Sequence, residues 1–182
     1  MIIKDFLNTI KPVLFLAIIP TVIILGIILL TQGGSKKTTI TEAYDNAVVA
    51  NSSIKLSKSD FNFGKISQKD GFVNTIYEVT NTGQEEIFLK EMYTSCMCTK
   101  AQLVYSDGSV SRLFSMKGMA NAQDFAVGKS LKPGETVEIK AIFDPNAHGP
   151  QGIGYIKRNI MLDTNMKDNP LIQVSFEAEV IK

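Results

Sequence analysis

The sequence predicts an all-β fold, an antiparallel β-sandwich, preceded by a single transmembrane helix. Beyond residue 54, several stretches alternate apolar and polar residues with a period of two, which is typical of strands with one buried face. Turn sequences rich in Asn, Asp, Gly and Pro separate these stretches. A continuous apolar run lies within the first thirty residues. Roughly seven or eight short strands in about 125 residues favour a sandwich over a barrel.

Four stretches show the strand pattern most clearly. In each of them, alternate residues form a row that we expect to face the core. The rows are Val73, Thr75, Tyr77 and Val79; Val137, Ile139, Ala141 and Phe143; Ile156, Arg158, Ile160 and Leu162; and Ile172, Val174, Phe176, Ala178 and Val180. The row that contains Arg158 is imperfect, because a cation interrupts its apolar face.

The 182 residues suffice for one domain and an anchor. We predict a short cytoplasmic tail over residues 1–11 and a transmembrane anchor over 12–31. A flexible linker over 32–53 is rich in Thr, Ser, Gly, Lys and Asn. The sandwich follows over 54–182. The segment 101–128 is interpreted as an insertion in it, with an extra hairpin around Ser106-Asp107-Gly108.

The anchor is predicted from the run between Val13 and Leu30, which contains no charged residue. A helix of this length spans about 27 Å, close to the ~30 Å hydrocarbon core of a bilayer. A lipid bilayer is therefore the first expected partner. A buried core helix is disfavoured because the run is continuous rather than amphipathic. A cleaved signal peptide is the stronger alternative, since Gly33-Gly34-Ser35 is a stretch of small residues, but the run is longer than a usual signal core.

The orientation of the anchor does not follow from its flanking charges. Lys4 and Lys11 precede the run, and Lys36 and Lys37 follow it, so the positive-inside count is balanced. A short N-terminal tail with a folded domain downstream usually translocates that domain. We therefore expect the domain outside the cytoplasm, in the periplasm or at the cell surface.

The composition disfavours several classes of function. Nineteen Lys and Arg nearly balance eighteen Asp and Glu, so nothing in the charge would recruit nucleic acid. The chain has one His. Its sequence contains no nucleophile elbow, phosphate-binding loop or H-E-x-x-H motif. We predict that the protein is not an enzyme and has no catalytic residues.

Two turn sequences have structural explanations. In Thr80-Asn81-Thr82-Gly83, the Asn side chain can bond to the backbone two residues later, and Gly83 would accept a positive φ. In Lys132-Pro133-Gly134-Glu135, Pro at the second position and Gly at the third favour a tight turn.

The pair Cys96-x-Cys98 is the one constellation that carries reactive chemistry. If the pair lies on a strand, both side chains point to the same face, and two thiolates could bind a soft ion such as copper or zinc. Additional candidate metal ligands are Met92, Met97, Met116, Met119 and His148. Against a zinc site, tetrahedral zinc takes four ligands and there is no second Cys pair.

Two other readings of the pair stay open. An oxidising compartment would favour a disulfide, and a ring closed across a single residue would be strained and easily reduced. Alternatively, both thiols are reduced and simply packed at a strand end. No cofactor is expected unless a metal binds here.

Six short motifs occur in order along the chain: Phe61-Asn62-Phe63-Gly64, Thr80-Asn81-Thr82-Gly83, Ser95-Cys96-Met97-Cys98-Thr99, Pro133-Gly134-Glu135, Phe143-Asp144-Pro145 and Thr164-Asn165. Together they resemble the bacterial immunoglobulin-like family numbered 1573 among the domains of unknown function, a relative of Hydin-type sandwich domains. The resemblance implies an immunoglobulin-like sandwich and no settled activity. About thirty residues between Cys98 and Pro133 depart from the family pattern.

The expected function is that of a non-enzymatic binding or structural module, anchored in a membrane, with a protein partner that the sequence does not identify. This expectation rests on analogy with other sandwich domains. The alternative is soft-metal binding or thiol redox chemistry at Cys96 and Cys98.

Overall fold

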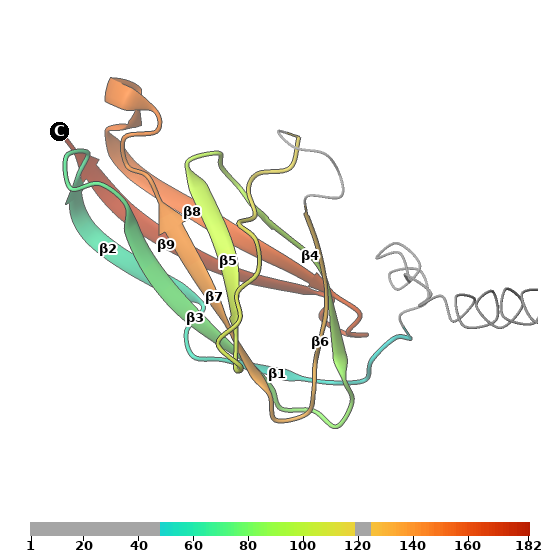
Figure 1. Cartoon of the computed structure of the whole chain (residues 1–182). Coiled ribbons are helices and arrows are strands. Elements are labelled where there is room, and N and C mark those ends of the chain that lie inside the picture. The colour runs from blue at the N-terminus through green and yellow to red at the C-terminus, as the bar shows by residue number, and fades with distance from the viewer. Residues whose placement is uncertain (1–47, 119–124) are drawn as a thin grey trace, which may run out of the picture. The chain divides into compact units, whose positions relative to one another are not determined.

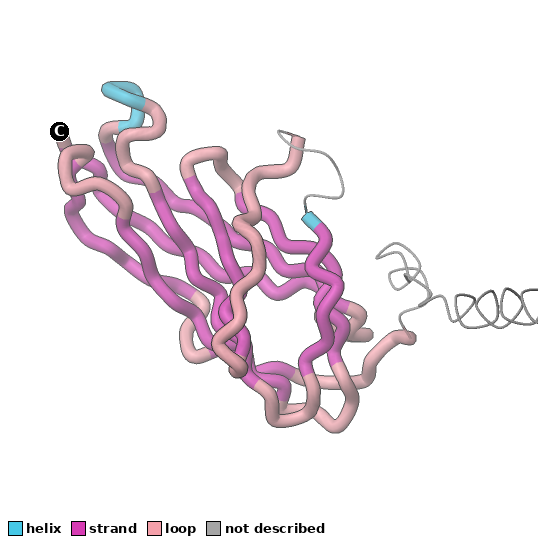
Figure 2. Tube along the Cα trace, viewed as in Figure 1, coloured by secondary structure: helices cyan, strands magenta, loops and turns pink. Residues whose placement is uncertain are grey.

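The computed structural model describes residues 48–118 and 125–182, which form a sandwich of two β-sheets (Figures 1 and 2). The first sheet has four strands in the order β1-β3-β7-β5, all antiparallel to their neighbours. Its strands are β1 (Ile54–Leu56), β3 (Val73–Asn81), β5 (Thr99–Tyr105) and β7 (Thr136–Phe143). The predicted all-β sandwich is confirmed in this part of the chain.

The second sheet has five strands in the order β2-β9-β8-β4-β6. Its strands are β2 (Asp60–Ser67), β4 (Ile87–Thr94), β6 (Ala126–Leu131), β8 (Gly154–Thr164) and β9 (Leu171–Ile181). The β2–β9 pair is parallel, which departs from the antiparallel sandwich predicted from the sequence. The physical reason is a crossing of the chain between the sheets. Strand β1 pairs with β3 in the first sheet, and the chain then enters the second sheet as β2, which runs in the same direction as β9.

The core lies between the sheets and is lined by the predicted rows. The apolar members of all four rows are buried apart from Val73, which is half-buried, and Arg158 is half-buried within its row. Tyr77 of β3 is fully buried, and its hydroxyl donates a hydrogen bond to the backbone oxygen of Ser175 in β9. The period-two pattern therefore identified the inward faces correctly.

The two predicted turns form for partly different reasons. At Pro133-Gly134, Gly134 has a φ of 78° and Glu135 N–H donates to the oxygen of Lys132, as expected. At Asn81, the side-chain oxygen accepts from Gly83 N–H at 3.0 Å, also as expected. The explanation given for Gly83 is wrong, because its φ is not positive. A Cβ there would lie 2.0 Å from Ser52 Oγ and 2.7 Å from Ser53 N, so the position needs Gly for close approach.

The segment 101–128 contains strands of the sandwich at both ends. β5 lies beside β7 in the first sheet, and β6 is an edge strand of the second sheet. The predicted hairpin around Ser106-Asp107-Gly108 is present: the chain turns there and returns along β5 through bridges at Val104–Val110 and Ala101–Phe114.

The predicted membrane anchor lies outside the residues that the structure describes. Within residues 48–118 and 125–182, no helix is long and apolar enough to span a membrane. The predicted tail 1–11, the anchor 12–31 and the linker up to residue 47 lie outside the described residues, and so does Met119.

Candidate functional site

Three loops meet at one end of the sandwich, which we call the loop end. They are the β2–β3 connection at 68–72, the β4–β5 connection at 95–98 and the β7–β8 connection at 144–153, all at the upper end of the view in Figure 1. Gln68 Nε2 donates to the backbone oxygens of Pro145 at 3.2 Å and Gly149 at 2.5 Å. Asp144 N–H donates to the oxygen of Cys98 at 2.9 Å. Hydrogen bonds therefore join all three loops.

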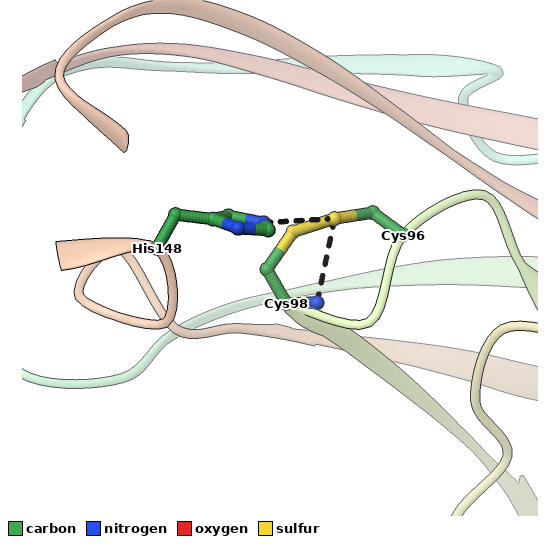
Figure 3. A group of neighbouring side chains, drawn as sticks. All are labelled: Cys96, Cys98 and His148. Atoms are coloured by element: carbon green, nitrogen blue, oxygen red, sulfur yellow. Dashed lines mark hydrogen bonds between the residues drawn. A yellow bond between two sulfur atoms is a disulfide. The ribbon is translucent and has the colours of Figure 1, made fainter. Parts of the chain in front are cut away.

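Cys96 and Cys98 lie in the tight turn between β4 and β5, and a disulfide joins them (Figure 3). Their Cα atoms are 5.3 Å apart, which is within the ordinary range for a disulfide. The strand argument for two side chains on one face does not apply, because the pair lies between strands. The turn itself is held by the Thr94 hydroxyl, whose one hydrogen is shared between the backbone oxygens of Cys96 and Thr99. Thr99 N–H also donates to the backbone oxygen of Cys96.

The two sulfurs have different surroundings. Cys98 is 3% exposed, whereas Cys96 is half-buried and adjoins Met97, which is 46% exposed. The Nε2 atom of His148 lies 3.3 Å from Cys96 Sγ, and Figure 3 shows the imidazole facing the disulfide. Because a disulfide sulfur carries no hydrogen, the imidazole N–H is the donor. The half-buried Cys96 sulfur therefore accepts a hydrogen bond from the imidazole.

The buried sulfur faces a cation instead. The Nε–H of Arg158 in β8 donates to Cys98 Sγ at 3.2 Å, and its Nη1 donates to the oxygen of Lys157 at 2.9 Å. Among the residues that the structure describes, no carboxylate lies within ion-pair distance of Arg158. Burial lowers the pKa of this guanidinium below its ordinary value. Arg158 is thus a half-buried cation whose contact inside the sandwich is a sulfur.

Arg158 is not among the site residues predicted from the sequence, although the sequence contains a signal for it. Arg158 interrupts the apolar row of its strand, and the strand register turns it toward the interior between Ile156 and Ile160. A charged residue on a buried face needs a partner. That partner is Cys98, sixty residues away in sequence.

The candidate metal ligands are only partly brought together. The ligand atoms of Cys96, Cys98 and His148 lie within 4.8 Å of one another. Met92 is buried in the core and Met97 is exposed in the turn. Met116 is half-buried in a segment that bridges to Thr94.

This arrangement does not favour a resident metal ion. Within residues 48–118 and 125–182, the cluster of His, Cys, Asp and Glu side chains offers three donors, fewer than the four of structural zinc. The two sulfurs are bonded to each other, and the Arg158 guanidinium lies against Cys98 Sγ. The positive charge of this guanidinium would repel a metal cation bound at the same sulfur. Copper or zinc binding stays a prediction.

The comparisons with known proteins support the fold. The model of a family described as "Protein of unknown function (DUF1573)" matches residues 54–109, which confirms the predicted resemblance over that stretch, including Cys96 and Cys98. No curated protein matches the chain.

Solved structures are similar to this chain in fold. A protein of unknown function from Porphyromonas gingivalis W83 is similar at 18% identity, with a TM-score of 0.52 over 75% of this chain, and this chain spans half of that protein's length (50%). Two further structures match at TM-scores below 0.5. They are the ASH/PapD-like domain 7 of human CEP192 (12% identity, TM-score 0.44, 75% of this chain and 92% of that one) and the periplasmic chaperone SfaE (9% identity, TM-score 0.36, 71% and 60%).

Proposed function

We propose that this chain is a membrane-tethered, non-enzymatic binding module whose sandwich lies outside the cytoplasm and contacts a protein partner through the loop end. The observation that carries the proposal is that each of the three loops presents an exposed apolar side chain. These are Phe72 at 71% exposure, Met97 at 46% and Ile153 at 46%. Single exposed apolar residues are ordinary, whereas several gathered on one end mark an interaction surface.

The chemistry of these side chains suits a protein partner. Aromatic residues and Met are enriched at protein–protein interfaces, where large apolar side chains exclude water. Hydrogen bonds between the loops hold them in place, so less ordering accompanies binding. The disulfide in the central loop adds a further constraint on the backbone around Met97.

Two features support attachment to a membrane and a location outside the cytoplasm. The uncharged run between Val13 and Leu30 is long enough for a transmembrane helix. The Cys96–Cys98 disulfide is a bond that persists in oxidising compartments and is rare in the cytosol. A tether of some twenty residues would then separate the sandwich from the bilayer.

Site-specific photocrosslinking in intact cells tests the binding surface. A photoreactive amino acid replaces Phe72, Met97 or Ile153 in turn. The control position is Val110, which is 57% exposed and lies beside Val104, near the end of β5 that is opposite the loop end. We expect all three loop-end positions to give protein adducts of the same mass and Val110 to give none. Adducts at all four positions alike, adducts to lipid, or no adducts would contradict the proposal.

A further inference from the structure

The two halves of the Cys96–Cys98 disulfide are chemically unequal. Cys96 is the more accessible sulfur and contacts the His148 imidazole at 3.3 Å. Cys98 is 3% exposed and contacts the Arg158 guanidinium at 3.2 Å. A disulfide that only braces a fold has no need of a half-buried cation against one sulfur.

We propose that this disulfide is a thiol–disulfide exchange site for protein dithiols, in which Cys96 is the sulfur attacked and Cys98 is the sulfur released. This inference goes beyond the proposed binding function and does not rest on it. Arg158 stabilises the charge on Cys98, and His148 stabilises the charge on Cys96.

The accessibility of the sulfurs decides which one is attacked. An incoming thiolate must approach one sulfur of a disulfide from the side opposite the bond that breaks. Cys98 is enclosed by its own turn and by β8, whereas Cys96 borders the surface beside exposed Met97 and His148. A protein thiol therefore reaches Cys96.

Arg158 decides which sulfur leaves. In the disulfide, its half-buried positive charge faces a neutral sulfur. When the bond breaks, Cys98 becomes a thiolate and the contact becomes a charge-assisted hydrogen bond at the same place. The effective dielectric constant is lower there than in water, so the attraction is stronger. The Thr99 hydroxyl, 3.7 Å from Cys98 Sγ, is a further donor for that thiolate.

The position of the disulfide in the sequence also suits exchange rather than bracing. The bridge closes a loop across a single residue. A cross-link restricts the unfolded chain less when its loop is short, so this one adds little stability. The turn is held independently by hydrogen bonds from Thr94 and Thr99. Opening the bond therefore leaves the surrounding structure supported.

The exchange is balanced as follows. A thiolate of the partner dithiol attacks Cys96 Sγ, a new S–S bond forms between them, and the Cys96–Cys98 bond breaks with its electron pair on Cys98. The partner's second thiol, as a thiolate, then attacks the partner sulfur of the mixed disulfide and releases Cys96. The partner is oxidised to a disulfide by two electrons, and Cys96 and Cys98 are reduced. The reverse sequence, with a protein disulfide as the oxidant, reoxidises the pair and reduces that disulfide to a dithiol.

The direction of attack can be mapped on the full-length wild-type chain in detergent, with reduced glutathione as the probe. The reaction is quenched with acid and alkylated, and the tryptic peptide 91–100, which contains both cysteines, is sequenced by mass spectrometry. We expect glutathione on Cys96 and alkylation on Cys98. Glutathione on Cys98, equal amounts on both, or no reaction unless the chain is unfolded would overturn the proposal.

The role of Arg158 is tested by equilibrating variants in a glutathione redox buffer. We expect the ratio of reduced to oxidised form at a fixed buffer to be about tenfold lower in Arg158→Gln than in wild type, equivalent to ~30 mV, and Arg158→Lys to recover part of this difference. Lys157→Gln, at an exposed neighbouring position, is the control and should match wild type. Equal reduction in Arg158→Gln and wild type would overturn the role of Arg158. If Arg158→Gln does not fold, the comparison of Arg158→Lys with wild type decides.

Discussion

The hydroxyl of Tyr77 donates a 2.6 Å hydrogen bond to the backbone oxygen of Ser175, and this bond joins the two sheets through the interior of the sandwich. Tyr77 belongs to β3 and Ser175 to β9. Tyr77 is fully buried and Ser175 is 4% exposed, so water cannot replace the bond. The contact fixes the position of one sheet against the other.

Replacing Tyr77 by Phe should lower the free energy of unfolding by about 1–2 kcal/mol, because a buried carbonyl loses its hydroxyl partner while the ring remains. Denaturant unfolding followed by circular dichroism measures the change. Tyr155→Phe is the control, since Tyr155 is 67% exposed and its hydroxyl bonds to Glu177 at the surface. An equal loss of unfolding free energy in both variants would show that the buried hydrogen bond stabilises the fold no more than the exposed one.

Tyr77 also predicts a loss of stability at alkaline pH. Burial raises the pKa of Tyr77 well above its ordinary value, with the Asp60 carboxylate as a smaller cause. The unfolded chain releases this proton near pH 10, whereas the folded chain keeps it. The stabilisation is therefore complete below about pH 10 and declines as the pH rises through the folded pKa. Melting temperatures between pH 9 and 11 should fall more steeply for wild type than for Tyr77→Phe. If the melting temperatures of wild type and Tyr77→Phe fall equally with pH over this range, the prediction is refuted.

Gly83→Ala should destabilise the sandwich by about 1–3 kcal/mol, because the added methyl group meets Ser52 and the Ser53 backbone. Adding Ser52→Gly should restore part of the loss, since one of the three close atoms is Ser52 Oγ and the other two are backbone. Thermal unfolding of the single and double variants measures both effects. Unchanged stability in Gly83→Ala would mean that the segment before β1 moves aside without cost.

The strands predicted with the clearest alternation are those with one fully buried face. β7 and β9 pack one row of side chains against the opposite sheet, so their sequence carries a strong period of two. β6 is an edge strand with the sequence AVGKSL, and its only fully buried residue is Leu131. The apolar–polar alternation of β6 is weak because this edge strand is held mainly by backbone pairing with β4. The crossing of the chain from β1 to β2 also leaves no periodic signal.

The candidate site was predictable where its residues are adjacent in sequence. Cys96 and Cys98 are recognisable from their spacing alone. His148 was named as a candidate ligand, but its contact with Cys96 depends on how the β7–β8 loop folds over the turn. Arg158 depends on strand register and on packing between elements sixty residues apart. Such contacts arise only once both sheets are assembled.

The state of the two cysteines separates thiol exchange from metal binding. We expect the purified full-length chain to show no free thiol and much less than one copper or zinc ion per chain, because each sulfur is bonded to the other. A thiol titration and elemental analysis, before and after mild reduction, measure this. The control is Cys96→Ser/Cys98→Ser. One ion per chain that is lost in the control would instead support a Cys96, Cys98 and His148 metal site.

The proposed function requires the sandwich to be attached to a membrane and to lie outside the cytoplasm. The most direct measurement is protease treatment of intact spheroplasts that express the full chain with a C-terminal epitope tag, combined with carbonate extraction of membranes from untreated cells. We predict that the tag is lost without permeabilisation and that the undigested chain stays with the extracted membranes. A tag that is protected until the cells are lysed, or a chain found in the soluble fraction, would contradict the account.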